Sequence, residues 1–117
     1  MNPVKISLAL SRGINGIGEP MSHIYYSELC LMGGDVSRNV DRLVKAGADG
    51  VGLMIDGVGW NDAYDRPGDY ARALASKGVE YSVHVPVWDA NLTSENPRIR
   101  EATAASYRFS IEFAALI

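Results

Sequence analysis

The sequence has one cysteine, no long hydrophobic run near its start and no excess of positive charge. Cys30 is the only cysteine among 117 residues, so an internal disulfide is excluded and a cysteine-type metal site has no basis. The net charge of about −3 gives no general positive field for a nucleic-acid backbone. The first apolar run, Ile6 to Leu10, is too short for a signal peptide or a spanning helix. We expect a cytoplasmic protein whose partners are neither nucleic acids nor membranes.

The composition is that of one globular domain, with 47% hydrophobic and 21% charged residues. Three short segments have the pattern of strands in a covered sheet. Val4–Leu10 alternates and then becomes continuously apolar, Gly50–Asp56 is an apolar run that begins at a glycine, and Val79–Val85 alternates with β-branched residues. These patterns predict a three-stranded sheet.

Helix signals follow each predicted strand. Asp35 and Asn96 are N-cap residues, and Pro67 suits the first turn of a helix. Glycines just past the apolar positions, Gly47 and Gly78, end the first two helices. The sequence therefore predicts three helices, each preceded by a strand.

The third predicted helix runs from Asn96 to Ile117 without a glycine, a basic last turn or a breaker. One apolar stripe along it is formed by Ile99, Ala102, Ser106, Phe109, Phe113 and Leu116. We expect the sequence to stop inside this helix, so that residues 1–117 are the N-terminal part of a single larger domain.

Alternating strands and helices predict a parallel sheet with right-handed crossovers. The links from strand to helix are long, over residues 11–34, 57–66 and 86–96, while the links from helix back to strand are short. Binding and catalytic groups of α/β proteins lie on loops at the carboxyl ends of strands. We therefore expect the functional groups on those three long links.

Three parallel strands cannot close a sheet, and their open edges favour self-association of the chain alone. A (β/α)₈ barrel takes about 250 residues, so three units in 117 residues fit its first part. We predict an α/β fold that is a partial TIM barrel, consisting of the first three β/α units.

The stretch His84–Ser94 (HVPVWDANLTS) carries a His-x-Pro segment with an Asn-Leu pair shortly after it. In this stretch, and in Gly47–Val51 (GADGV) before the second strand, the sequence resembles the xylose-isomerase-like TIM-barrel superfamily. That group includes sugar-phosphate isomerases and epimerases and the AP endonuclease family 2 enzymes. The chain departs from the group at Gly52, where a glutamate is common, which weakens any transfer of a strand-two role.

The resemblance implies a divalent metal, Mn²⁺, Mg²⁺ or Zn²⁺, for the complete protein. In the endonucleases the histidine that corresponds to His84 is a zinc ligand. In the sugar isomerases and epimerases the metal ligands and the acid–base carboxylates lie on later strands, which here would be beyond Ile117. His84 is thus a candidate metal ligand or substrate contact, and the alternative is a histidine hydrogen-bonded to a neighbouring loop.

Five more residues on these links are candidates for substrate binding. Trp60 and Trp88 offer flat aromatic surfaces, and either could instead pack between loop and helix. The polar groups beside them are Asp56, Asp89 and Asn91. An aspartate in the place of Asp56 binds substrate or orients His84 in one interpretation and caps a turn in the other.

Three functions follow. The first is an isomerase or epimerase that moves a proton next to the carbonyl of a small sugar or sugar phosphate with metal assistance, of which this chain is an inactive N-terminal part. The second is a zinc-dependent hydrolase like the AP endonucleases, against which the acidic net charge counts. The third is a half-barrel without catalysis that acts as an interaction module.

Overall fold

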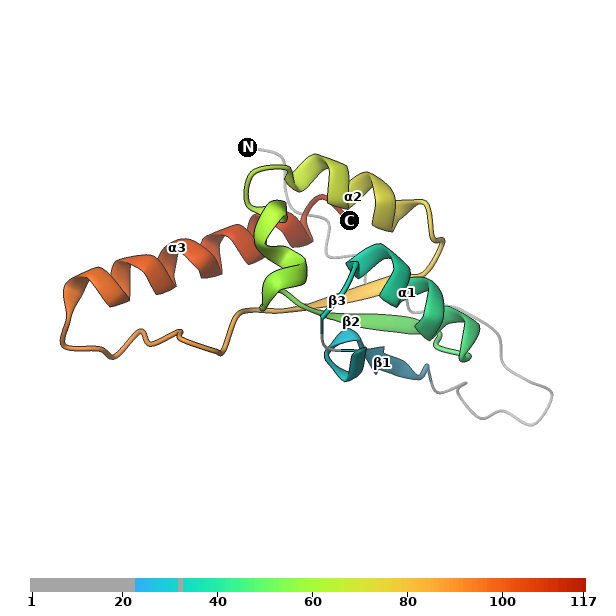
Figure 1. The fold of residues 1–117 in the computed structure, drawn as a ribbon, viewed down its shortest axis with the longest axis horizontal. Helices are drawn as coiled ribbons and strands as arrows, with labels where there is room; N and C mark the ends of the chain where they lie inside the picture. Colours follow the sequence, from blue (N-terminus) through green and yellow to red (C-terminus); the bar gives the residue numbers. More distant parts are fainter. Residues whose placement is uncertain (1–22, 32) are drawn as a thin grey trace, which may run out of the picture.

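The computed structural model describes residues 23–31 and 33–117, which form an α/β fold (Figure 1). Its elements in chain order are β1 (Tyr25–Ser27), the 3₁₀ segment η1 (Glu28–Leu31), α1 (Val36–Lys45), β2 (Gly50–Met54), the 3₁₀ segment η2 (Val58–Ala63), α2 (Pro67–Ala75), β3 (Glu80–His84) and α3 (Pro97–Ala114).

The three strands pair in parallel in the order β1-β2-β3. The second and third predicted strands are confirmed. The first predicted strand, Val4–Leu10, lies outside the described residues, and β1 arises within a segment that we expected to be a loop. That expectation was wrong for Tyr25–Ser27, because the strand is defined by pairing with β2 over a long sequence distance and not by a periodic pattern of its own.

The helices begin where the caps predict. The Asp35 carboxylate accepts the Arg38 amide at 2.8 Å, and the Asn96 side chain accepts the Arg98 amide at 3.0 Å. Pro67 is the first residue of α2. Gly47 and Gly78 follow α1 and α2 with positive φ angles of 97° and 64°, which glycine adopts without a steric penalty.

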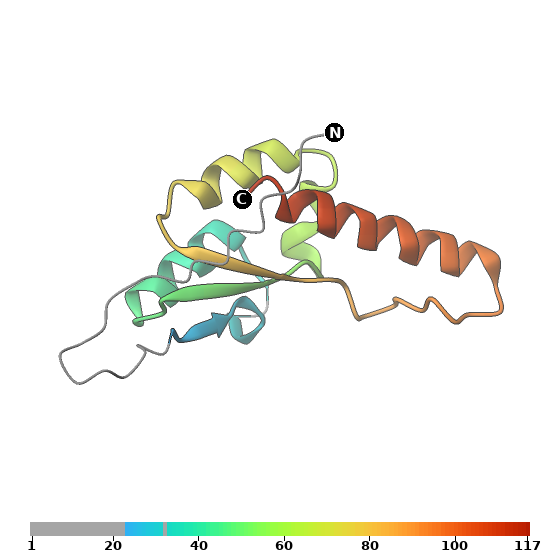
Figure 2. The same cartoon turned by 180° about the vertical axis from the view of Figure 1, so that it is seen from behind.

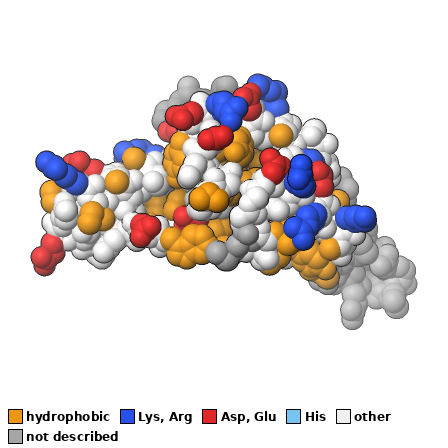
Figure 3. Space-filling view, viewed as in Figure 1, with side chains coloured by type: hydrophobic (Ala, Val, Ile, Leu, Met, Phe, Trp, Pro, Cys, Tyr) orange, Lys and Arg blue, Asp and Glu red, His pale blue; other side chains and the backbone are white. Residues whose placement is uncertain are grey.

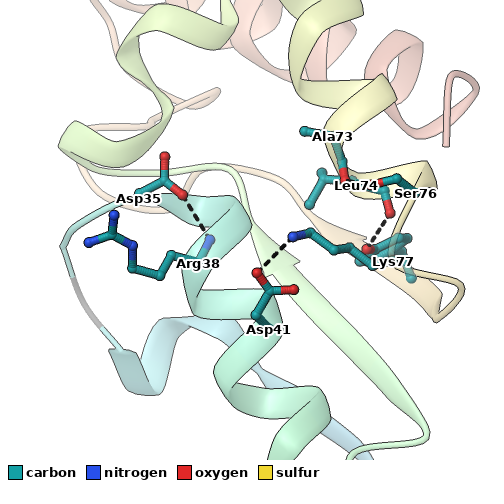
Figure 4. A network of polar contacts seen from close by, with 8 residues as sticks. Asp35, Arg38, Asp41, Ala73, Leu74, Ser76 and Lys77 are labelled. Atoms are coloured by element: carbon teal, nitrogen blue, oxygen red, sulfur yellow. Dashed lines mark hydrogen bonds and ion pairs between the residues drawn. The ribbon is translucent and has the colours of Figure 1, made fainter.

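The helices α1 and α2 cover one face of the sheet. On β2 this face presents Val51 and Leu53, both fully buried, and Ile55 continues it past the strand. Helix residues in the same core are Val36, Val40, Leu43, Ala71, Leu74 and Phe113. An ion pair of 2.7 Å between Lys77 and Asp41 joins the end of α2 to α1 at the surface (Figure 4).

Helix α3 projects from the sheet as an arm (Figures 1 and 2). Phe113 near its C-terminus is buried in the core, whereas Ile99 near its N-terminus is 42% exposed. Figure 3 shows hydrophobic side chains gathered where the arm meets the rest of the molecule. Of the predicted apolar stripe, Phe113 is buried, Ser106 and Phe109 are partly buried, and Ile99, Ala102 and Leu116 are exposed.

Helix α3 ends at Ala114 and not at Ile117 as we expected. The amides of Ala115 and Leu116 bond to carbonyls three residues back, which tightens the last turn. Among the described residues, no helix is both long and apolar enough to cross a membrane.

Candidate functional site: a cavity at the carboxyl ends of the strands

The segments after all three strands meet around a cavity of about 290 Å³. Glu28 and Leu29 follow β1, residues 56–60 follow β2, and Trp88 follows β3. Gly33 and Gly34 complete the wall before α1 begins. The cavity thus lies at the carboxyl ends of the strands, where the sequence predicted the functional groups.

Glu28 is the buried carboxylate of the cavity wall, with 7% of its surface exposed. Its Oε1 atom accepts a hydrogen bond of 2.9 Å from Nδ2 of Asn39, a buried residue of α1. The same amide group lies 3.2 Å from the carbonyl of Leu31 and 3.3 Å from that of Gly33. Asn39 therefore fixes both the carboxylate and the segment that follows it.

Sequence reasoning missed Glu28. It comes directly after β1, and an acidic residue directly after a strand is a usable signal for a functional group. That signal needed β1 to be recognised, and the segment was expected to be a loop.

Asp56 connects the loop after β2 to the loop after β3 by hydrogen bonds. Its Oδ2 atom accepts the amides of Val87 and Trp88, each at 2.9 Å, and its Oδ1 atom accepts the amide of Gly57 at 3.0 Å. These hydrogen bonds match the interpretation of Asp56 as a residue that caps a turn, and a role in substrate binding stays a prediction. Within the described residues the carboxylate makes no hydrogen bond to His84, so Asp56 positions Trp88 instead.

The two tryptophans differ in environment. Trp88 is 44% exposed and lines the cavity beside Gly57. Trp60 is 1% exposed and packs against Tyr70 and Phe113, with ring centroids 5.8 and 5.5 Å away. Trp60 is therefore the packing residue of the two, although it forms part of the cavity wall.

His84 ends β3 and is exposed. Its Nδ1 atom lies 2.7 Å from the carbonyl of Val85, and since a carbonyl only accepts, this is a hydrogen bond when Nδ1 carries the proton. In the neutral ring Nε2 is then the atom with a free lone pair. His84 is not among the residues that line the cavity.

The described residues do not by themselves fit the divalent metal that the resemblance implies. Within residues 23–31 and 33–117, no three His, Cys, Asp or Glu side chains are grouped closely enough to hold an ion together. His84 is at most one ligand of such a site.

A second cavity of about 350 Å³ lies between the β3–α3 loop and α3. Asp89 lines it and has a positive φ of 59°, a conformation that aspartate tolerates better than most residues. Asn91 lies further along the loop. Its side-chain Oδ1 accepts a hydrogen bond of 3.0 Å from the backbone amide of Thr93, and its backbone amide donates one of 3.0 Å to Thr103 Oγ1. Asn91 thus shapes the loop, and Asp56 and Trp88 line both cavities.

The face of the sheet opposite α1 and α2 carries a contact across all three strands. Tyr25 on β1 donates to Glu80 on β3 at 2.7 Å, and its ring passes over Gly50 on β2. The hydrogen bond to Glu80 raises the pKa of Tyr25 above its usual value. A side chain at position 50 would collide with the ring, so any residue other than glycine there would have to displace Tyr25.

Comparison with models of protein families, with curated proteins and with solved structures found no match to this chain. The resemblance to xylose-isomerase-like barrels therefore rests on the residues of the sequence and stays a prediction. The α/β fold with three parallel strands is established by the structure itself.

Proposed function

We propose that the cavity at the carboxyl ends of the strands binds a small sugar. The observation that carries the proposal is the convergence of three post-strand segments on one cavity that combines an exposed indole with a buried carboxylate. The sites of small ligands combine apolar and aromatic walls with a few fixed polar groups in this way.

A sugar matches both kinds of group. The exposed face of Trp88 suits the apolar face of a sugar ring, and the Glu28 carboxylate suits its hydroxyl groups. Glycine backbone at Gly57 allows a ligand to approach the main chain closely. At Gly59 the corresponding space is taken by the Gly34 carbonyl oxygen, 2.7 Å from where a Cβ would lie.

We further propose that the chain supplies the first three units of a barrel that isomerises or epimerises its sugar. Such a reaction moves a proton next to a carbonyl, with a divalent metal polarising the oxygen atoms. The metal ligands and acid–base carboxylates are expected outside residues 1–117, with His84 as one possible ligand through Nε2. In this proposal the chain shapes the binding site and is inactive alone.

The sugar site is tested by titrating the chain with D-xylose, D-fructose and D-glucose while recording tryptophan fluorescence. At least one sugar is expected to change the emission of the exposed Trp88, and Trp88→Ala is expected to abolish the change. The matched control is Ile111→Ala, since Ile111 is 67% exposed on α3 and outside the cavity. The absence of any response to all three sugars contradicts the proposal.

We also propose that the chain made alone self-associates. Of the described strands, β1 and β3 each have a partner on one side only. Ile99 and Ile111 on α3 are exposed, as is Leu116 just after it. Sedimentation equilibrium is expected to give a mass that rises with concentration. A monomer that melts cooperatively at all concentrations contradicts this proposal without affecting the sugar site.

A further inference from the structure

The charges around the cavity restrict which sugar it accepts. Glu28 and Asp56 are both acidic, and none of the described residues that line the cavity is Lys, Arg or His. A cleft lined by one sign of charge concentrates ligands of the opposite sign and repels those of the same sign. A phosphate ester would meet two carboxylates there without a cationic partner.

The two carboxylates differ in how they are stabilised. Asp56 accepts three backbone amides through its two oxygens. Glu28 has one described donor, the Asn39 amide on Oε1, and forms no ion pair with the described residues. A buried carboxylate is stabilised by charged donors, and an ammonium group of a ligand at Glu28 would supply the charged donor that the described residues do not.

Trp88 adds a second group that attracts a cation. Its indole is 44% exposed on the cavity wall, and an indole face is the best aromatic partner of an ammonium group. Leu29, and Val58 at the rim, add apolar surface to the lining beside these groups.

We infer that the ligand of this cavity carries a protonated primary amine, as an amino sugar does, with the ammonium group at Glu28 and the sugar ring against Trp88. The inference rests on the proposed sugar site and narrows its ligand from sugars in general to cationic ones. It disfavours the sugar phosphate that the sequence left open.

Three probes of the same ring test it by isothermal titration calorimetry of the full chain in slightly acidic buffer, where amines are protonated and carboxylates ionised. D-glucosamine is expected to bind about tenfold or more tightly than D-glucose, as one charge-assisted hydrogen bond provides. D-glucose 6-phosphate is expected to bind more weakly than either.

Two variants assign the effect to the cavity. Glu28→Gln keeps an oxygen for Asn39 and is expected to reduce D-glucosamine to the affinity of D-glucose. Val58→Lys places a positive charge at the rim, where Val58 is 76% exposed, and is expected to weaken D-glucosamine and strengthen D-glucose 6-phosphate. Ile111→Lys adds the same charge on α3 and is expected to change neither affinity.

The outcomes separate the inference from the proposed function. If D-glucose or its phosphate binds as tightly as D-glucosamine, the ammonium inference is overturned and the sugar site stands. If none of the three probes binds, the ammonium inference is overturned, and the sugar site is overturned with it only if D-xylose and D-fructose also give no response. If Glu28→Gln unfolds the chain, the ammonium inference is tested by Val58→Lys alone. It is overturned if this variant does not weaken D-glucosamine and strengthen D-glucose 6-phosphate.

Discussion

The two faces of the sheet are built differently, although the same three strands provide both. On the face beneath α1 and α2, Val51 and Leu53 of β2 are fully buried in an apolar core. On the other face β2 presents Gly50, Gly52 and Met54, of which Met54 is 8% exposed. A Cβ at Gly50 would lie within 2.6 Å of the Tyr25 ring. The apolar core is thus concentrated on one face, while the other combines two glycines, Met54 and a polar contact between Tyr25 and Glu80.

The difference between the two faces affects the candidate site because the cavity lies where the strands end. Its loops are attached to the stable face through Trp60 and to each other through Asp56. Glu28 and Trp88, the two groups of the proposed binding site, are not part of the core cluster. Changes to the core and changes to the site are therefore expected to have separable effects.

The largest effect on folding is expected from Leu53→Ala on the covered face. Leu53 is fully buried, and truncation leaves a cavity that typically costs about 2–5 kcal/mol in the free energy of unfolding. Ser82→Ala on the exposed face of β3 is the control and is expected to change it by less than about 0.5 kcal/mol. Chemical denaturation measures both, and equal effects would refute the asymmetry of the two faces.

Asp56→Asn is expected to have the next largest effect, at the end of the sheet where the loops meet. The substitution replaces one acceptor oxygen by an NH₂ group that faces backbone donors, which costs about 1–3 kcal/mol. It should also alter the fluorescence of Trp88. Asp62→Asn removes an exposed ion pair with Arg66 and is expected to cost about 0.5 kcal/mol or less.

Gly50→Ala and Gly52→Ala form a matched pair on the open face. Alanine at position 50 must displace the Tyr25 ring and break its hydrogen bond to Glu80, with an expected cost of about 1 kcal/mol. Alanine at position 52 meets Ser82 Oγ at an ordinary 3.4 Å and is expected to be near neutral. Thermal unfolding and the phenol pKa of Tyr25 measure both changes. Equal losses of stability in the two variants would contradict the packing of the Tyr25 ring over Gly50.

The smallest effect on the free energy of unfolding at neutral pH is expected at Tyr81. Its side chain faces the covered side of the sheet and donates to the Leu74 carbonyl at 2.7 Å. Burial raises the pKa of Tyr81 to about 12, above the value of about 10 in an unfolded chain. The folded state then holds its proton longer, so stability is expected to fall as the pH rises from about 10 to about 12. In Tyr81→Phe this decline should be smaller, and denaturation at several alkaline pH values measures it.

Much of the fold was predictable because its signals are local. The caps Asp35 and Asn96, the proline at position 67 and the apolar run of β2 each identify an element without knowledge of its neighbours. β1 was missed because three residues carry no period, and their strand character comes from pairing with β2.

The site was predicted only in its location. Trp88 and Asp56 line the cavity, but the sequence does not show that Asp56 is occupied by backbone amides or that η2 turns Trp60 into the core. Glu28 was missed together with β1. Its burial depends on Asn39 of α1, a contact that arises only when the helix packs.

The most direct test of the sugar site is a ¹H–¹⁵N correlation spectrum of the labelled chain during titration with D-glucosamine. If the cavity binds the sugar, the largest shifts are expected on the amides of Glu28 and Gly57 and on the indole of Trp88. An unchanged spectrum, or shifts confined to residues outside the cavity such as Ile111, would contradict the proposed sugar site.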